Sequence, residues 1–494
     1  MVGDIDTTVG ERDIIAEKKP NENERDIIME KSEKKLEQIS SVHPSLMALQ
    51  YPILFPFGED GYHDEISYVD SETQTKKKRK RITMKEYYSY RLQVRKNEGL
   101  HVRLAGRLYQ QYVVDAFSCI EQARLWWLRT HQTNLRSDLY STLAKKVVNG
   151  GTDATNVGKG FVLPANFLRS KRYMQQNFQD ALAVCRVVGH PDIFLTMTCN
   201  SQWTEIKEMM NSLPGCSARD SLDIIAHVFH LKLEQLIEDI KTKFFFGNFI
   251  GEAWSPTCAY VKLDGDSKRN LTANVDKYVT AKIPDPIIDP VAYDAVRSLM
   301  IHGPCGLRNT KSPCMKDGKC TKHFPKKYCR ETYFDQPGFP IYKRRNTGLS
   351  VMKGSCVLDN QWVVPYNTYL LVKYNCHMNV EIYCHARSLK YLFKYFLKGH
   401  DRATVEISSQ KRESANQEES VDEINAYFDG RYICASEAAY RIFSFPIHHR
   451  SIYVLRLSFH LLGERSCTFI EKENLEKVVR REQYKQSQVE AFFI

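Results

Sequence analysis

A cluster of thiols and imidazoles lies in the segment HGPCGLRNTKSPCMKDGKCTKHFPKKYC, residues 302–329. The first three candidate metal ligands are Cys305, Cys314 and Cys320. The fourth would be His302 or His323, and Cys329 is a further possible ligand. Thiolate and imidazole groups favour Zn²⁺, which takes four such ligands and needs no redox chemistry. Because all four would be protein atoms, the zinc site would be structural. The C-x8-C-x5-C spacing is not that of a standard zinc finger, so free cysteines in a Gly/Pro-rich loop are the alternative.

Two tyrosines and two lysines share one face of a predicted helix in SLKYLFKYFLKG, residues 388–399. They are Tyr391, Lys394, Tyr395 and Lys398, whose i, i+3, i+4, i+7 spacing stacks them over two turns. Leucines and phenylalanines repeat with a similar period on another face, which is typical of a stripe packed against a core. The pattern therefore fits either a reactive row of phenols and ammonium groups or tyrosines that merely edge a core helix.

The composition is that of a large, basic, globular chain. It has 494 residues, 43% of them hydrophobic, which is enough for two to four domains of about 150 residues each. Lys and Arg number 70 against 59 Asp and Glu, and the net charge of +11 favours contact with phosphate backbones. The run KKKRKR at 76–81 fits a solvated loop, a nuclear-import signal or a DNA contact.

Several classes of protein are not expected. The 14 cysteines follow no secretory signal, which argues against a disulfide framework. No apolar run approaches the roughly 20 residues that span a bilayer, so we expect a soluble protein without a membrane partner. Gly158 and Lys159 are followed by Gly160 where a P-loop needs Ser or Thr, so no ATP site is expected in this chain.

The order of segments predicts an α+β fold. Apolar recurrences at three and four residues predict helices at 82–145, 171–186, 204–213 and 221–245. Period-two alternation predicts strands in DIFLTMTCN, residues 192–200, and at 377–383. We expect a charged flexible arm (1–40), an extended packed segment and basic loop (41–81), a mainly helical domain (82–300), a Cys/His module (301–345) and a tyrosine-helix region with the C-terminal segment (346–494).

Long motifs follow one another in order across most of residues 40–460. They include PSLMALQYPILFPFGEDGYH, GRLYQQYVVDAFSCIE, HPDIFLTMTCNSQW, MIHGPCGLRNTKSPCMKDGKCTKHFPKKY, SLKYLFKYFLKGHDRA and DGRYICASEAAYRIF. Together they resemble the Helitron transposon replication-initiator protein, particularly its plant versions. The resemblance implies a helicase-like N-terminal domain, an HUH-class endonuclease with an antiparallel sheet flanked by helices, and then a helicase.

The resemblance also implies a nuclear protein that nicks single-stranded DNA. In the family a tyrosine attacks a phosphodiester, leaving a 5′-phosphotyrosine and a free 3′-OH that primes rolling-circle synthesis. Tyr391 and Tyr395 fall on the positions of the paired tyrosines that permit two strand transfers. A phenol is a poor nucleophile at neutral pH, so Lys394 and Lys398 would favour the phenolate, and Mg²⁺ or Mn²⁺ would polarise the phosphate.

The chain departs from the family at the metal site. The family carries a His-hydrophobe-His pair in a segment resembling GLPHAH, but the corresponding interval 244–270 contains no histidine. Substitute ligands could be His227 with His230, or His377 with Glu381. Without a bound cation the tyrosines should be inert, and without an intact strand the sheet should be gapped or rearranged. The absence of helicase motifs adds the expectation of a truncated transposon copy.

Three hypotheses therefore follow from the sequence. The first is an initiator that binds single-stranded DNA without catalysis, because basic clusters beside aromatic residues suit strand binding. The second is an active nuclease that uses substitute ligands. The third is a zinc-stabilised DNA-binding protein reused by its host.

Overall fold

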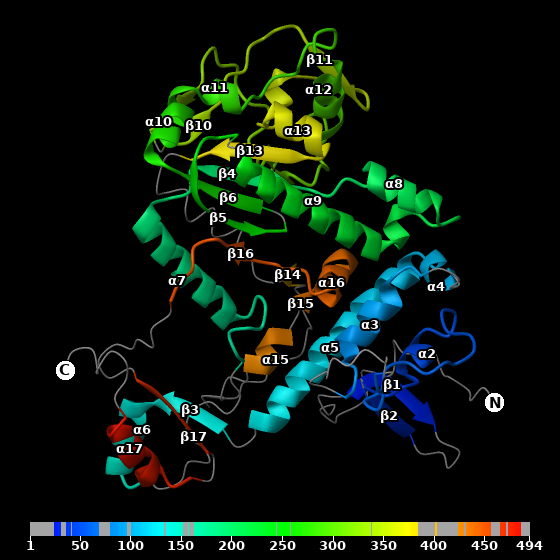
Figure 1. Ribbon diagram of the computed structural model, residues 1–494, viewed down its shortest axis with the longest axis vertical. Coiled ribbons are helices and arrows are strands. Elements are labelled where there is room, and N and C mark those ends of the chain that lie inside the picture. The colour runs from blue at the N-terminus through cyan, green and yellow to red at the C-terminus, as the bar shows by residue number, and fades with distance from the viewer. Residues whose placement is uncertain are drawn as a thin grey trace.

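The computed structural model combines helices with antiparallel strands (Figure 1). It describes residues 24–30, 36–40, 42–68, 80–95, 100–132, 135–151, 157, 163–243, 245–256, 258–336, 338–383, 401–402, 423–428, 431–455, 465–470 and 473–485. This arrangement is of the α+β class expected from the sequence.

The helices and strands have the following bounds. The helices are α2 (Leu46–Gln50), α3 (Met84–Leu92), α4 (His101–Leu104), α5 (Arg107–Gln132), α6 (Tyr140–Val148), α7 (Lys171–Val188), α8 (Thr204–Asn211), α9 (Leu222–Thr242), α10 (Gly265–Ala273), α11 (Val275–Tyr278), α12 (Pro290–Ala295), α13 (Thr368–Tyr374), α15 (Glu423–Phe428), α16 (Ala435–Ile442) and α17 (Leu475–Gln483). Shorter helical turns are η1 (Ala218–Asp220), η2 (Val296–Met300) and η3 (Asn360–Trp362). The strands are β1 (Glu24–Glu30), β2 (Leu36–Ser40), β3 (Leu135–Leu139), β4 (Ile193–Met197), β5 (Phe249–Ser255), β6 (Cys258–Leu263), β7 (Met315–Lys316), β8 (Lys319–Cys320), β9 (Tyr333–Phe334), β10 (Pro340–Ile341), β11 (Ser350–Lys353), β12 (Cys356–Asp359), β13 (Met378–Ile382), β14 (Asp401–Arg402), β15 (Arg431–Tyr432), β16 (His449–Arg450) and β17 (Ser466–Ile470).

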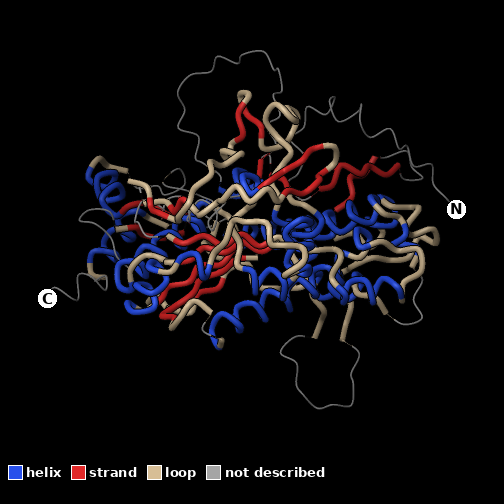
Figure 2. The backbone as a smooth tube through the Cα atoms, turned by 90° about the horizontal axis from the view of Figure 1, so that it is seen from above, coloured by secondary structure: helices blue, strands red, loops and turns tan. Residues whose placement is uncertain are grey.

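The central element is a five-stranded antiparallel sheet in the order β13-β4-β6-β5-β16. On one face, Ile193, Leu195 and Met197 of β4 are buried with alternate residues of β6 and β13. Helix α9 covers this face with apolar side chains such as Leu236, which is fully buried. Figure 2 shows the strands of the sheet passing between helices. The predicted strands β4 and β13 and the predicted helices α7, α8 and α9 are thereby confirmed.

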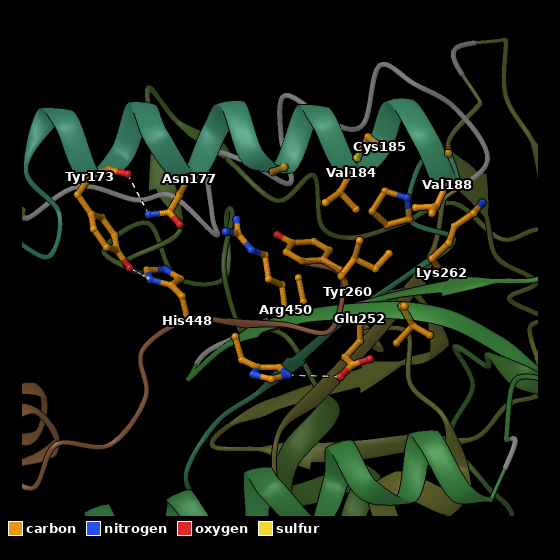
Figure 3. Close-up of a pocket in the computed structure, with 18 residues that line it drawn as sticks. Tyr173, Asn177, Val184, Cys185, Val188, Glu252, Tyr260, Lys262, His448 and Arg450 are labelled. Atoms are coloured by element: carbon orange, nitrogen blue, oxygen red, sulfur yellow. Dashed lines mark hydrogen bonds and ion pairs between the residues drawn. The ribbon is translucent and has the colours of Figure 1, made fainter. Parts of the chain in front are cut away.

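The opposite face of the sheet carries one aligned side chain from each strand, and we call it the row face. The row is Glu381, Phe194, Tyr260, Ala253 and Arg450, in register across the five strands. Helix α7 lies over the end of this face formed by β5, β6 and β16 (Figure 3). The sheet is therefore enclosed by apolar packing on one side and carries polar and aromatic groups on the other.

Two strands of the interval 244–270, β5 and β6, are paired members of this sheet, so the expectation of a gap in the sheet was wrong. Strands β5 and β6 pair along their length as a hairpin. Ala259 and Val261 of β6 point into the main core, and this apolar alternation holds the strand without a histidine pair. The turn before β5 needs glycine at position 247. Gly247 has φ +108°, and a Cβ there would lie 2.5 Å from the Cβ of Ser267.

A second core joins α2, α3 and α5 to α16, far along the chain. Leu54, Val113 and Ala438 are fully buried in it. The segment 41–81, expected to be extended and packed, contains the short helix α2, and Tyr51 and Phe55 after it are buried in this core. Within the predicted flexible arm, β1 and β2 form an antiparallel pair.

Two smaller cores lie outside the central sheet and the helical core. One runs from Ile283 to Leu371 and encloses the Cys/His segment, so it extends beyond both ends of the predicted module 301–345. The other packs α6 and α17 against the β3–β17 pair. Across the described residues, none of the helices combines the length and the apolar character that crossing a bilayer requires.

Candidate metal centre and sheet face

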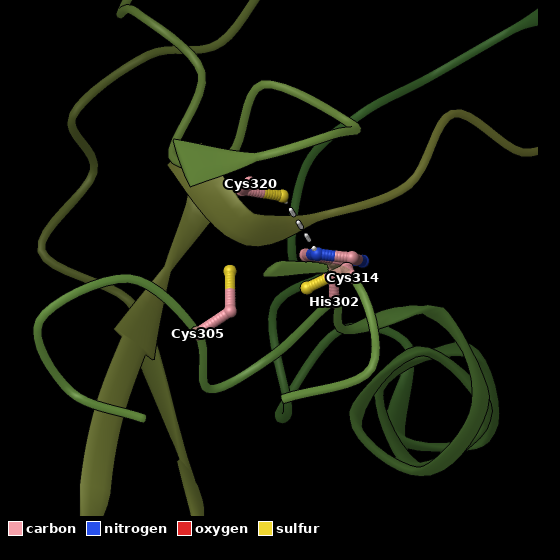
Figure 4. A group of neighbouring side chains, drawn as sticks. All are labelled: His302, Cys305, Cys314 and Cys320. Carbon is pink, nitrogen blue, oxygen red and sulfur yellow. Dashed lines mark hydrogen bonds between the residues drawn. The ribbon is translucent and has the colours of Figure 1, made fainter. Parts of the chain in front are cut away.

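Four of the predicted ligands converge on one point beside the module core (Figure 4). The sulfurs of Cys305, Cys314 and Cys320 and a ring nitrogen of His302 all lie within 4.8 Å of one another. The Cys320 Sγ and His302 Nε2 atoms are 3.4 Å apart. Zinc–sulfur bonds of about 2.3 Å and zinc–nitrogen bonds of about 2.0 Å place tetrahedral ligand atoms roughly 3.5 to 3.8 Å apart. A small contraction of the group would therefore let it hold such an ion.

Short backbone elements position these ligands. Cys314 directly precedes β7 and Cys320 is the last residue of β8, so the β7–β8 hairpin brings the two thiols to the same end. The N–H of His302 donates to the carbonyl of Trp362 at 2.8 Å, and its ring stacks on Phe324 with centroids 4.2 Å apart. The imidazole is thus oriented by contacts that do not involve the other ligands.

His323 and Cys329 lie outside the group. His323 is exposed in a left-handed backbone conformation with φ +57°. The thiol of Cys329 donates to the carbonyl of Glu331 at 2.6 Å, and its backbone pairs with that of Arg344. Of the two histidines that the spacing left open as fourth ligand, the structure brings His302 to the thiols and leaves His323 away.

The electrostatic surroundings suit metal binding. Burial and nearby lysines lower the pKa of His302, which keeps the imidazole in the neutral form that binds a metal. Burial and the two neighbouring thiols raise the pKa of Cys305. Three neighbouring thiolates repel one another, so a cation bound between them would favour their ionisation.

The row face of the sheet is the second candidate site. At its β13 end, the Glu381 carboxylate accepts hydrogen bonds from Asn379 Nδ2 and from the Tyr383 hydroxyl, each at 3.0 Å. Next to it, Phe194 and Tyr260 stack with ring centroids 5.2 Å apart and an interplanar angle of 23°. The face therefore carries one fixed carboxylate beside a buried pair of stacked aromatic rings.

Strand β6 occupies the part of the chain in which the family resemblance led us to look for two histidines. Its side chains on the row face are Cys258, Tyr260 and, further along, Lys262. Cys258 and Tyr260 are buried with Phe194 and Tyr383 in a small cluster. A thiol and a phenol thus stand on this strand, and neither is a usual ligand for Mg²⁺ or Mn²⁺ in its neutral form.

The substitute ligands considered from the sequence are not brought together on the row face. His227 and His230 lie on α9, where their rings pack against Phe445. His377 and Glu381 are four positions apart along an extended segment, a separation of roughly 13 Å. Among the described residues, the Cys/His cluster is the single group of three or more His, Cys, Asp or Glu side chains close enough to share a metal ion.

The predicted nucleophiles fall outside the described residues. These residues are Tyr391, Lys394, Tyr395 and Lys398, and the structure does not describe them. The described residues include Tyr383, one position after β13, whose N–H donates to the carbonyl of Asp192 at 2.8 Å, and then continue from Asp401. Their catalytic roles therefore stay predictions.

One feature of the row face was missed from the sequence. A cavity lies between α7 and the β5–β6–β16 end of the sheet, lined by Tyr173 and Val184 from the helix and by Arg450 from the edge strand (Figure 3). The apolar periodicity of α7 predicted a helix. The edge strand β16, which lies opposite this helix, comes more than 250 residues later in the chain. Only the fold brings them together.

Comparison with known proteins agrees with the sequence resemblance in its coarse form. The family model described as the Helitron helicase-like domain at the N-terminus matches residues 87–255. This span begins in α3 and ends with β5, just before the turn into β6. No match is found among curated proteins. The chain is therefore similar to this Helitron domain from α3 to β5, a span that includes two of the five strands of the central sheet, β4 and β5.

Proposed function

We propose that this chain is a Helitron-type rolling-circle replication initiator that binds single-stranded DNA but does not cut it. The observation that carries the proposal is strand β6. It directly follows the segment matched to the Helitron family and presents Cys258 and Tyr260 on the row face, where the family resemblance leads us to expect two metal-binding imidazoles. Without a cation to offset the charge of the phosphate, an attacking tyrosine gains too little stabilisation for strand cleavage.

Binding of single-stranded DNA is supported by the side chains of the row face. Stacked aromatic rings next to cations are the usual platform for single strands, because every base has a face that can stack. Tyr260 lines the cavity under α7, where its ring is held by the buried Phe194, and Lys262 and Arg450 line the same cavity at the β5–β6–β16 end. The net charge of +11 acts in the same direction. We further propose that the sheet is of the HUH-endonuclease type, that the lineage is plant-like and that the protein acts in the nucleus.

The Cys/His cluster is proposed as a structural zinc site with His302, Cys305, Cys314 and Cys320 as ligands. Three thiols and one imidazole are a donor set that selects zinc over Mg²⁺ or Mn²⁺. The ion would fix the loop between η2 and β11 to the module core and would have no open position for chemistry.

The proposal is tested by separating binding from cleavage. The protein is incubated with a labelled single-stranded oligonucleotide and Mg²⁺ or Mn²⁺, binding is measured by fluorescence anisotropy, and covalent adducts are sought on denaturing gels. We expect binding that weakens linearly with the logarithm of salt concentration and no adduct. The double variant Tyr391→Phe/Tyr395→Phe should bind as the wild type does.

Each alternative gives a different result in the same experiment. A metal-dependent adduct that disappears in the double tyrosine variant would show an active nuclease and overturn the proposed lack of cutting. Absence of any salt-sensitive binding to single strands would overturn the proposal as a whole. A preference for duplex DNA over single strands would favour a zinc-stabilised DNA-binding protein reused by its host.

A further inference from the structure

The cavity between α7 and the row face has a volume of about 250 Å³ (Figure 3). Helix α7 lines it with side chains that repeat every three or four residues: Tyr173, Asn177, Ala181, Val184 and Val188. In the described part of the chain, none of these side chains belongs to an apolar core. The side of this 18-residue helix that faces the sheet therefore lines a cavity and does not pack into an apolar core.

Apolar and aromatic side chains form opposite walls of the cavity. Tyr260 lies on the sheet side, and its ring is held in place by stacking on Phe194, which in turn contacts Tyr383 edge to face at 5.9 Å. Val184 and Val188 lie on the helix side (Figure 3). A planar group that slides between helix and sheet would meet an aromatic face already fixed in position, so little ordering would be needed on binding.

The polar groups around the cavity are fixed and their charges are balanced. Arg450 Nη1 pairs with Asp180 at 2.6 Å, and Lys262 Nζ pairs with Asp192 at 3.0 Å. Asn177 Nδ2 donates to the carbonyl of Tyr173 at 2.9 Å, which orients the amide. Because each cation has an acidic partner, the interior does not select a phosphate. Guanidinium, ammonium and amide groups nevertheless carry several N–H donors each, which can serve the edge of an uncharged heterocycle.

We propose that this cavity receives a single nucleobase of the bound DNA strand. The inference rests on the proposed function, because it assigns one base of that strand to a defined pocket. The volume lies below the roughly 300 to 1,000 Å³ of pockets for drug-sized ligands, and fits one planar heterocycle. Aromatic stacking on one side, an aliphatic wall on the other and polar groups at the rim are the features that proteins use for an unstacked base.

The first test uses the unaltered protein. Affinity is measured for an oligonucleotide of about 16 nucleotides and for a series in which one position at a time is abasic. If a base occupies the cavity, removing it at one position should weaken binding by about 5- to 150-fold, the range expected for one stacked base. Removal at most other positions should have a smaller effect.

The second test fills the cavity. Val184→Trp places an indole in the space, while Val187→Trp adds the same group to the same helix at a side chain that is 84% exposed. Val184→Trp should bind the intact oligonucleotide with the low affinity that the wild type shows for the abasic oligonucleotide it binds most weakly. Introducing the same abasic site should then cause no further loss of affinity for this variant. The exposed variant should behave as the wild type, and matching unfolding midpoints would show that both variants are folded.

The outcomes separate this inference from the proposed function. Tight binding by the wild type with equal affinity for all abasic oligonucleotides overturns the base pocket but leaves binding of single strands standing. Absence of binding to any oligonucleotide overturns both. The base pocket is supported if one abasic position weakens binding to the wild type and to Val187→Trp but has no effect on binding to Val184→Trp.

Discussion

Asp239 ties the helix that covers the sheet to the helix that leads into its edge strand, and its replacement by asparagine should measurably destabilise the protein. The carboxylate lies on α9 and is 6% exposed. It accepts a hydrogen bond from the Tyr374 hydroxyl of α13 at 2.5 Å and one from Lys373 of the same helix. Lys243, at the end of α9, pairs with it at 2.9 Å. One buried charge thus holds three partners from two elements.

The magnitude follows from the pKa of this carboxyl group. Burial alone would raise the pKa of Asp239, but the hydrogen bonds from Lys373, Tyr374 and Lys243 outweigh burial and lower it from 3.8 to about 2. That difference corresponds to roughly 2.5 kcal/mol of stability. Because the folded-state pKa lies below the unfolded one, this stability is fully present above about pH 4 and is lost as the pH falls through about 2.

The assay is urea unfolding of the wild type and of Asp239→Asn at a series of pH values. At pH 7 the variant should be less stable by about 2.5 kcal/mol, and the difference should shrink as the pH is lowered from 4 toward 2. Asp266→Asn is the matched control, because Asp266 and Arg269 form an ion pair of two exposed side chains. That variant should stay within about 0.5 kcal/mol of the wild type. A difference for Asp239→Asn that is absent at pH 7, or that does not change with pH, would refute the reasoning.

Three further predictions concern the metal centre, the turn before β5 and the main core. Cys320→Ser should reduce the zinc content from about one ion per chain to nearly none by elemental analysis, while Cys356→Ser, outside the cluster, should leave it unchanged. Gly247→Ala should lower the urea stability by about 1 to 3 kcal/mol, because the backbone there has φ +108°; an unchanged midpoint would speak against this account. Leu236→Ala should cost about 2 to 5 kcal/mol in the same assay, since Leu236 is fully buried, whereas Leu231→Ala, 64% exposed, should cost less than about 0.5 kcal/mol.

Local periodicity was sufficient to predict the elements whose apolar face is complete within one segment. Helix α9 was expected at 221–245 and is found at Leu222–Thr242, because its apolar residues recur every three or four positions along its whole length. Strand β4 was predicted from period-two alternation, and Ile193, Leu195 and Met197 are indeed buried on one face. In both cases one side of the element packs against the core, so the buried positions coincide with the apolar positions of the sequence pattern.

Features that depend on distant partners could not be predicted in the same way. The spacing of the Cys/His segment gave His302 and His323 equal standing, and the choice depends on Trp362 and Phe324, which orient the ring of His302. The β5–β6 hairpin was doubted because a family motif is absent, although Ala259 and its apolar neighbours suffice to hold the strand in the sheet. A missing functional motif was thus a poor guide to a missing structural element.

The strands of the sheet pair without the histidine motif because the contacts that hold them lie mainly away from the row face. Strand pairing at the end near the cavity is secured by Asp192, whose carboxylate is 1% exposed. It accepts the N–H of Leu263 at 3.0 Å and pairs with Lys268 at 2.9 Å, while its carbonyl accepts the N–H of Tyr383. Together with the apolar face under α9, these contacts fix β4, β6 and β13 without using the chemistry of the row face. The pairing of these strands therefore does not depend on a particular set of functional groups on the row face, which is why the sheet forms although the interval 244–270 has no histidine.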